Sequence, residues 1–330
     1  MGGMAQGFES ILKKLIDAGE PVLDEWLFGL SDLNRQDMAA FIQTWPQIPA
    51  SRRCTIARRL ASLAEEHIEV HYDALFRHLL DDPEGTVQVA AVEGLWENED
   101  TRLIKPLVRL LEEGDDPQVR AAAAISLGRF VLLGELEEIE TAAAFQAESA
   151  LWSVLHSTEE DLEVQRRAVE SIAYSGEMAV RDVILNAYYH DDDRMRMSAV
   201  FAMGRSADPY WRALVLQELL SDHPGLRFEA ARAAGELELT DAVPGLLQLL
   251  DEDEDIEVVQ AAITALGQIG GQEARRALSA CLEADNEAIR DAAEEALELL
   301  EFNEISEDIP LIAQDLSNNE GYDYLMDEED

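Results

Sequence analysis

The feature that most constrains the fold of this chain is a repeat with a period of about 31 residues. At seven successive places an apolar residue is followed four positions later by alanine. One insertion of about fourteen residues interrupts the period after Gly128. Self-similarity at a fixed period is typical of repeat architectures, in which each unit packs only on its neighbours. The apolar residues, called anchors below, are Val87, Val119, Val164, Met195, Leu226, Val258 and Ile289, and the alanines are Ala91, Ala123, Ala168, Ala199, Ala230, Ala262 and Ala293.

Each repeat is predicted to contain two helices. A third residue of apolar character, such as Leu127 or Leu266, follows each anchor by eight positions, so positions 0, 4 and 8 form one helix face. An apolar segment long enough for about three helical turns precedes that helix, as in "LIKPLVRLLEEG". The residue seven positions after each anchor is small, which would let neighbouring second helices approach closely. Glycines nine positions after an anchor are predicted to lie at the ends of the second helices, and they are Gly128, Gly204, Gly235 and Gly267.

The stretch "NAYYHDDDRMRMSAVFAMG" places His190 beside three aspartates, which are ligand types of a divalent metal site. Equivalent acidic segments, such as "EGDDPQ" and "ADNEA", separate the two helices of the other repeats. Acidic residues ahead of a helix cap its free amides and complement its dipole. His190 is replaced elsewhere by proline, glycine or glutamate, so we interpret the cluster as a turn and expect no metal ion and no cofactor.

The whole chain is predicted to be all-α, an α-solenoid of stacked helix pairs, because its composition is rich in alanine and leucine with few strand-like alternations. Residues 1–71 are expected to form divergent helices that cap one end of the array. Residues 72–300 would hold the seven repeats with the insertion after Gly128. Residues 301–330, with eleven acidic residues and no basic one, are expected to be an acidic tail.

The charge of the chain limits its partners. Sixty-nine acidic residues against 25 basic ones give a formal charge of −44, which repels the phosphate backbone and argues against nucleic acid. No apolar run reaches twenty residues, so no membrane insertion is expected, and without a secretory signal we expect a cytoplasmic protein. Cys54 and Cys281 indicate neither a disulfide nor a zinc site.

The segments "DPQVRAAAAISLG" and "DIEVVQAAITALGQIG" resemble HEAT repeats, in particular the short bacterial HEAT-like repeats named after phycobiliprotein (PBS) lyases. The resemblance covers about residues 72 to 300. It implies an α-solenoid whose second helices line a concave face, and most such proteins are binding scaffolds. HEAT-like repeats also build bilin lyases and the di-iron deoxyhypusine hydroxylases. The hydroxylases hold iron with His-Glu dipeptides, and none of the six histidines here is followed by glutamate.

Positions 2, 6 and 10 after each anchor point roughly opposite to the apolar stripe, and we expect them to face a partner. In the central repeats, large apolar groups and arginines occupy these positions, which predicts a groove with an arginine rim. The alternatives are that the solenoid buries part of this face or that the face is rotated by one residue. The candidate partner-binding residues are Ile125, Arg129, Arg166, Tyr174, Met197, Phe201, Arg205, Phe228 and Arg232.

A non-enzymatic protein-binding scaffold is the function that this pattern favours, without catalytic residues. The partner would be a protein or peptide, as a helix or as an acidic and apolar segment. Residues 301–330 interleave apolar and acidic residues and could occupy the groove within the chain, or could serve solubility alone. The alternative function is a HEAT-like bilin lyase or prosthetic-group chaperone. Arginines directly after an anchor are predicted to form local pairs or a ladder between repeats, and they are Arg120, Arg196, Arg227 and Arg290.

Overall fold

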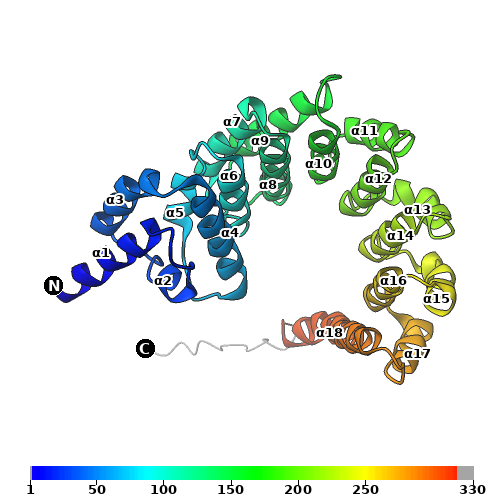
Figure 1. The fold of residues 1–330 in the computed structure, drawn as a ribbon. Helices are drawn as coiled ribbons and strands as arrows, with labels where there is room; N and C mark the ends of the chain where they lie inside the picture. Colours follow the sequence, from blue (N-terminus) through cyan, green and yellow to red (C-terminus); the bar gives the residue numbers. More distant parts are fainter. Residues whose placement is uncertain (1, 318–330) are drawn as a thin grey trace, which may run out of the picture. The chain divides into compact units, whose positions relative to one another are not determined.

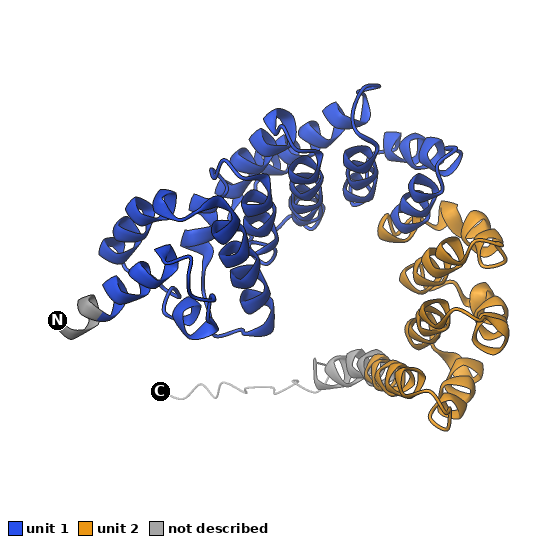
Figure 2. Cartoon of the chain, viewed as in Figure 1, with its two compact units in different colours: residues 1–202 blue, residues 203–330 orange. Residues whose placement is uncertain are grey.

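The computed structural model describes the backbone of residues 2–317 and the side chains of residues 7–303, and within this part all regular structure is helical (Figure 1). The fold is the predicted α-solenoid, in which the second helices of successive pairs pack side by side. The chain divides into two compact units, residues 1–202 and 203–330, and the division falls inside one helix, α12 (Figure 2).

The first four helices of unit 1 precede the repeats and are held together by a buried arginine, Arg52. The Arg52 side chain donates to the carbonyl oxygens of Leu15 at 2.7 Å and Glu20 at 2.6 Å. Leu15 lies at the end of the first helix, where carbonyls have no partner inside the helix, and Glu20 lies in the loop that follows it. The bounds are α1 Gly2–Ile16, α2 Asp24–Phe28, α3 Arg35–Thr44 and α4 Ala50–Glu66.

Four helix pairs follow in unit 1. The predicted insertion lengthens helices rather than adding a loop, because α8 continues past Gly128 to Glu135 and α9 has 15 residues. The pairs are α5 Asp73–Leu79 with α6 Gly85–Glu93, α7 Ile104–Glu113 with α8 Pro117–Glu135, α9 Thr141–Leu155 with α10 Leu162–Ile172, and α11 Ala179–Tyr188 with α12 Asp193–Arg205.

Three further pairs make up unit 2. The last helix runs to Ser317, past residue 300, where we expected the acidic tail to begin. The predicted contact of the acidic tail with the groove concerns side chains from residue 304 onward, which lie outside the described residues. The pairs are α13 Arg212–Glu218 with α14 Pro224–Glu236, α15 Val243–Glu252 with α16 Ile256–Ile269, and α17 Gly271–Cys281 with α18 Glu287–Ser317.

The core follows the repeat. All seven alanines at position 4 are fully buried, and the first six anchors are buried, while Ile289 in the last repeat is half-buried. The acidic turns cap the second helices as predicted: the Asp116 carboxylate accepts from the amide of Gln118 at 2.9 Å, and Asp255 accepts from Glu257 at 3.0 Å. The period therefore sets both the buried stripe and the helix starts.

Three of the glycines nine positions after the anchors, Gly204, Gly235 and Gly267, lie in the last turn of their helices as predicted. Gly128 lies in the middle of α8, so it does not end a helix. A Cβ added there would stand 2.7 Å from the Ser171 Cβ on the neighbouring second helix, and one added at Gly267 would stand 2.8 Å from the Ala296 Cβ. Position 9 of one repeat thus packs on the small residue at position 7 of the next, and glycine is needed for this close approach.

Candidate partner-binding groove

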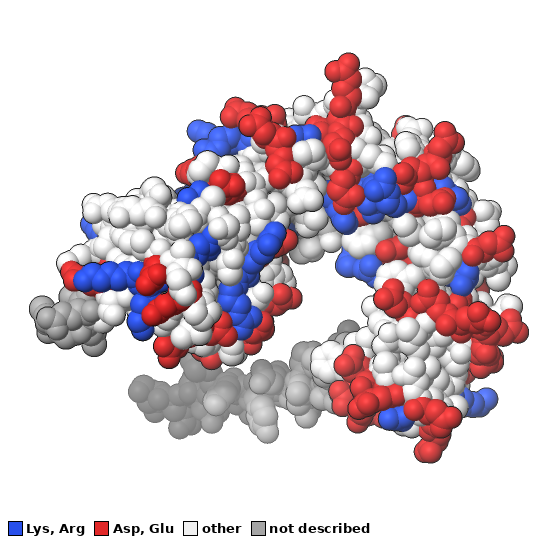
Figure 3. All heavy atoms as spheres, in the orientation of Figure 1, with Lys and Arg blue, Asp and Glu red and all other residues white. Residues whose placement is uncertain are grey.

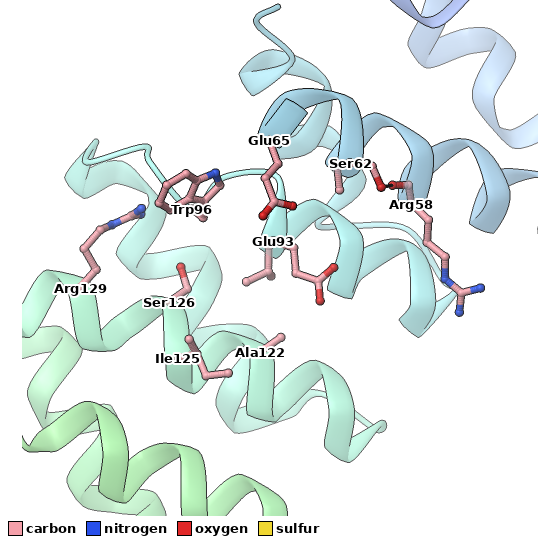
Figure 4. Close-up of a pocket in the computed structure, with 11 residues that line it drawn as sticks. Arg58, Ser62, Glu65, Glu93, Trp96, Ala122, Ile125, Ser126 and Arg129 are labelled. Atoms are coloured by element: carbon pink, nitrogen blue, oxygen red, sulfur yellow. Dashed lines mark hydrogen bonds between the residues drawn. The ribbon is translucent and has the colours of Figure 1, made fainter. Parts of the chain in front are cut away.

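A groove of about 900 Å³ opens on the second-helix face of unit 1, between α4, α6 and α8 (Figure 4). Its lining residues on α4 and on α8 are spaced 0, 3, 4 and 7 positions apart, so each helix presents one face to the groove. The lining residues, called the unit 1 groove below, are Arg58, Ala61, Ser62, Glu65, Val92, Glu93, Trp96, Ala122, Ile125, Ser126 and Arg129.

Two large apolar side chains of the unit 1 groove are exposed. Trp96 is 56% accessible and Ile125 is 52% accessible. Trp26, Trp45 and Trp211 are buried, so the exposure of Trp96 is not a general property of tryptophan in this chain. An exposed tryptophan inside a concavity is a typical anchor for a binding partner.

Trp96 was not predicted as a binding residue, although its position in the repeat is unusual. It lies nine positions after the anchor Val87, where four other repeats have glycine. A tryptophan at this position would prevent the close helix packing seen at Gly128. The chain avoids the conflict because α6 ends at Glu93, so that Trp96 lies beyond the helix and extends into the groove (Figure 4).

The polar groups of the groove include two carboxylates without partners. The Glu65 and Glu93 side chains form no hydrogen bond or ion pair with any residue that the structure describes, and neither does the Arg58 guanidinium. Burial raises the pKa of Glu93; the positive charge of Arg58 acts against this shift, and the negative charge of Glu65 adds to it. Figure 4 places Glu65 and Glu93 between Trp96 and Arg58.

Arg129 forms one end of the groove but is largely used within the chain. Its guanidinium donates to the carbonyl oxygens of Asn98 at 2.5 Å and Leu95 at 3.3 Å, and it lies over the Phe130 ring at 5.2 Å. Burial lowers the pKa of Arg129, and the nearby Glu97 and Glu99 act against this shift. Arg129 therefore braces the loop after α6 in addition to lining the groove.

The remaining predicted residues of unit 1 lie on, or just after, the later second helices α10 and α12. Arg166 donates to Glu163 at 2.6 Å and to the Ser198 hydroxyl at 3.0 Å, and that hydroxyl donates to Glu170 at 2.6 Å. This network joins α10 to α12. Tyr174, Met197 and Phe201 are half-buried, so this part of the face is less open than the groove.

In unit 2, the predicted residues gather around Glu236. Its carboxylate lies 3.4 Å from Arg205 and 3.6 Å from Arg232, and Arg232 lies over the Phe228 ring at 5.8 Å. Burial raises the pKa of Glu236, while the two arginines act against the shift. The predicted arginine rim is thus engaged by groups of the chain itself, and the role of these residues in binding stays a prediction.

The face predicted from the period is slightly rotated on α8. Ile125 and Arg129, at positions 6 and 10, line the groove as expected. Ala121, at position 2, is buried, and Ala122 and Ser126 line the groove instead. The open face of α8 therefore lies between the predicted positions and the next residue along the chain.

The arginines after the anchors form the predicted local pairs and ladder. Arg120 reaches Glu160 of the following repeat at 2.8 Å, and Arg227 reaches Asp253 at 2.6 Å. Arg290 donates to the Ala284 carbonyl at 2.7 Å, and Arg196 pairs locally with Asp193 at 3.1 Å.

His190 takes part in a turn. Its Nδ1 accepts from the amide of Asp192 at 3.0 Å, and the Asp192 carboxylate accepts from the amide of Arg194 at 2.9 Å. These are the contacts of a segment that starts a helix. Among the described side chains, no group of three or more histidine, cysteine, aspartate or glutamate residues is arranged to hold a metal ion.

The family model for HEAT repeats matches residues 72–147 and 212–298. The chain belongs to the HEAT-like repeat family. This HEAT-repeat chain matches no curated protein. In its described part, no helix combines the length and the apolar character that a membrane crossing requires.

Three solved structures are similar to this HEAT-repeat chain. The complex of CpcE and CpcF of phycocyanin lyase from Nostoc has a TM-score of 0.50 at 16% identity, over 86% of this chain and 96% of that one. The human deoxyhypusine hydroxylase has a TM-score of 0.35 at 17% identity, over 91% and 97%. The Escherichia coli protein YibA has a TM-score of 0.41 at 14% identity, over 91% and 97%. At these identities the similarity is one of fold.

Proposed function

We propose that this HEAT-repeat protein is a non-enzymatic scaffold that binds a segment of a partner protein in the unit 1 groove. The observation that carries the proposal is the pair of exposed apolar side chains, Trp96 and Ile125, inside one concavity of about 900 Å³. Burying such side chains against a partner removes apolar area from water, which supplies most of the energy at the centre of a protein interface.

The shape of the groove suits a helix or an extended segment. Its walls are the faces of α4 and α8, and the end of α6 lies between them. An amphipathic helix can place apolar side chains on Ile125 and Trp96 at i, i+3 and i+4 spacing. The Ser62 hydroxyl donates to the Arg58 carbonyl at 3.3 Å, a contact that serves its own helix rather than a catalytic base.

Site-specific photo-crosslinking tests the proposal. A photoreactive amino acid at Ala122, in the groove, should give covalent adducts with a defined protein in native extract, and Trp96→Ala should reduce their yield. The same photoreactive residue at Phe145, which is exposed on α9 and does not line the groove, is the matched control. Equal adducts from both positions, or adducts that do not depend on Trp96, would show that the groove is not the binding site.

A prosthetic-group function is the second candidate, because the volume of the groove also lies in the range of small-molecule sites. The fold similarity to the phycocyanin lyase complex is consistent with this alternative but names no ligand. Titration with an open-chain tetrapyrrole separates the two functions. A shift of the pigment absorbance that disappears in Trp96→Ala would favour a pigment chaperone over a protein scaffold.

A further inference from the structure

We infer that the unit 1 groove selects a basic segment, whose lysine or arginine side chain lies against Trp96 and between the carboxylates of Glu65 and Glu93. This inference rests on the proposed scaffold function and names the chemistry of the partner. It differs from the acidic and apolar partner that the sequence favoured, because the structure shows where the charges of the chain are already used.

The first argument is that the arginines already have partners within the chain. Arg129 donates to two backbone carbonyls, and Arg166 is held by Glu163 and Ser198. Arg205 and Arg232 both lie beside Glu236. An acidic partner would compete with these groups for each arginine. The predicted arginine rim therefore offers little unused positive charge.

The second argument is that two carboxylates of the groove have no such partner. Glu65 and Glu93 line the groove without a hydrogen bond or ion pair to the described residues. By contrast, Asp82, Glu160 and Asp253 are each paired with an arginine of a neighbouring helix pair or of α4. Burial disfavours the charged form of Glu93. A cation supplied by a partner would offset that cost, whereas an acidic partner would increase it.

The third argument is the aromatic ring beside them. Tryptophan is the best aromatic partner for an ammonium or guanidinium group, and the aliphatic stem of lysine or arginine packs well on its ring. Figure 4 shows the Trp96 ring next to Glu65, with Glu93 toward the middle of the groove. Ile125 and Val92 complete an apolar surface for the stem.

The two ends of the groove restrict the position of the cation. Arg58 lies at the end away from Trp96 and would repel a basic side chain there (Figure 4). Arg129 lies beside Trp96 at the opposite end (Figure 4), where Glu99 and Glu97 partly balance its charge. The cation is therefore expected between the two arginines, over the Trp96 ring and close to Glu65. Acidic side chains also cover much of the visible surface of both units (Figure 3), and with a formal charge of −44 the chain attracts basic partners over a long range.

Peptide titrations on the full chain test the inference. The probes are three fluorescein-labelled amphipathic peptides of leucine and alanine whose polar face carries lysine, glutamine or glutamate. The lysine peptide should bind at 1:1 stoichiometry, and Trp96→Ala or the double variant Glu65→Gln with Glu93→Gln should weaken it about tenfold, as for loss of a central interface contact. Retained thermal unfolding profiles would show that the variants are folded.

The matched controls are Glu112→Gln with Glu113→Gln on α7, which remove two exposed charges outside the groove, and Phe145→Ala on α9. These variants should change the affinity by less than twofold. If they weaken the lysine peptide as much as the groove variants do, the attraction is unspecific and the inference is wrong.

The remaining outcomes separate this inference from the proposed function. Tighter binding of the glutamine or glutamate peptide, lost in Trp96→Ala, would overturn the basic partner but leave the scaffold in place. If no peptide binds while Trp96-dependent crosslinks persist at Ala122, the basic partner is again overturned. If those crosslinks are absent too, both proposals fail.

Discussion

Arg53 and Asp82 form a buried ion pair, with 2.9 Å between the arginine Nε and the aspartate Oδ2, that joins α4 to the turn between α5 and α6. Trp45 donates its indole N–H to the same carboxylate at 2.6 Å, and the Glu84 amide donates to it at 2.9 Å. These contacts hold α4 beside the repeats, and α4 is one wall of the unit 1 groove.

The Asp82→Ala variant should be strongly destabilised, because it leaves the Arg53 charge buried without its partner. The expected loss is about 3 kcal/mol in the free energy of unfolding, measured by urea denaturation. Asp81→Ala is the control, since the neighbouring Asp81 pairs with Arg109 at the surface and should contribute less than about 1 kcal/mol. Equal losses in the two variants would mean that the buried pair does not hold α4 in place.

The glycine at position 9 should not tolerate a methyl group. In Gly267→Ala the new Cβ would lie 2.8 Å from both the Ala296 Cβ and the Ala296 carbonyl oxygen, so α16 and α18 would have to separate. We expect a loss of about 1 to 3 kcal/mol in chemical denaturation, as for other overpacked interfaces. Gly7→Ala, whose Cβ would have nothing within 4 Å, should cause no loss. A stable Gly267→Ala protein would contradict close packing at this position.

The buried alanines provide a second test of the register. Ala168 is fully buried, so Ala168→Leu should overpack the helix interface at a cost of about 1 to 3 kcal/mol. Ala122 is half-buried at the groove, and Ala122→Leu should cost less. Chemical denaturation of both variants gives the comparison, and equal stabilities would indicate an error in the register.

The raised pKa of Glu93 predicts a pH-dependent stability effect. Because burial raises the pKa above its usual value of 4.5, the folded protein binds more protons than the unfolded chain between the two values, and stability falls as the pH rises through this window. Glu93→Gln removes that effect. The variant should have the same or a higher Tm than the parent at pH 7, and the difference should disappear near pH 4.

The same variant separates stability from binding. Glu93→Gln should retain its Tm at pH 7 while, combined with Glu65→Gln, it binds the lysine peptide more weakly. Thermal unfolding at both pH values, beside Glu113→Gln as an exposed control, is the measurement. A Tm at pH 7 clearly below that of the parent would show that Glu93 stabilises the fold, against our assignment.

The fold could be predicted from the sequence because the 31-residue repeat has physical causes. One alanine in each repeat must be buried, so this feature recurs with every unit. The turn also has to cap the next helix, which an aspartate does before α8, α10 and α16 and His223 does before α14. The helix α4 was expected among the divergent helices of residues 1–71 but did not match the repeat, for a specific reason. Arg53 precedes the buried Ala57 by four residues, the spacing of an anchor and its alanine, but arginine is not apolar. Its burial depends on Asp82, which no local pattern reveals.

The candidate site was only partly predictable. Ile125 and Arg129 follow from the helical period, whereas Trp96 lies outside the helix, where the period no longer describes the direction of a side chain. The arginines were identified by their positions, but their partners were not. Contacts such as those of Arg129 with the Leu95 and Asn98 carbonyls join residues more than thirty positions apart and depend on how neighbouring repeats stack.

Hydrogen exchange of the full chain, with and without the lysine peptide, tests the central claim most directly. If the unit 1 groove binds a basic segment, amides of α4, of α8 and of the segment around Trp96 should exchange more slowly with the peptide, and Trp96→Ala should abolish this protection. Amides of α16 should be unchanged, since that helix does not line the groove. Protection confined to unit 2, or equal protection in the Trp96→Ala variant, would contradict the account.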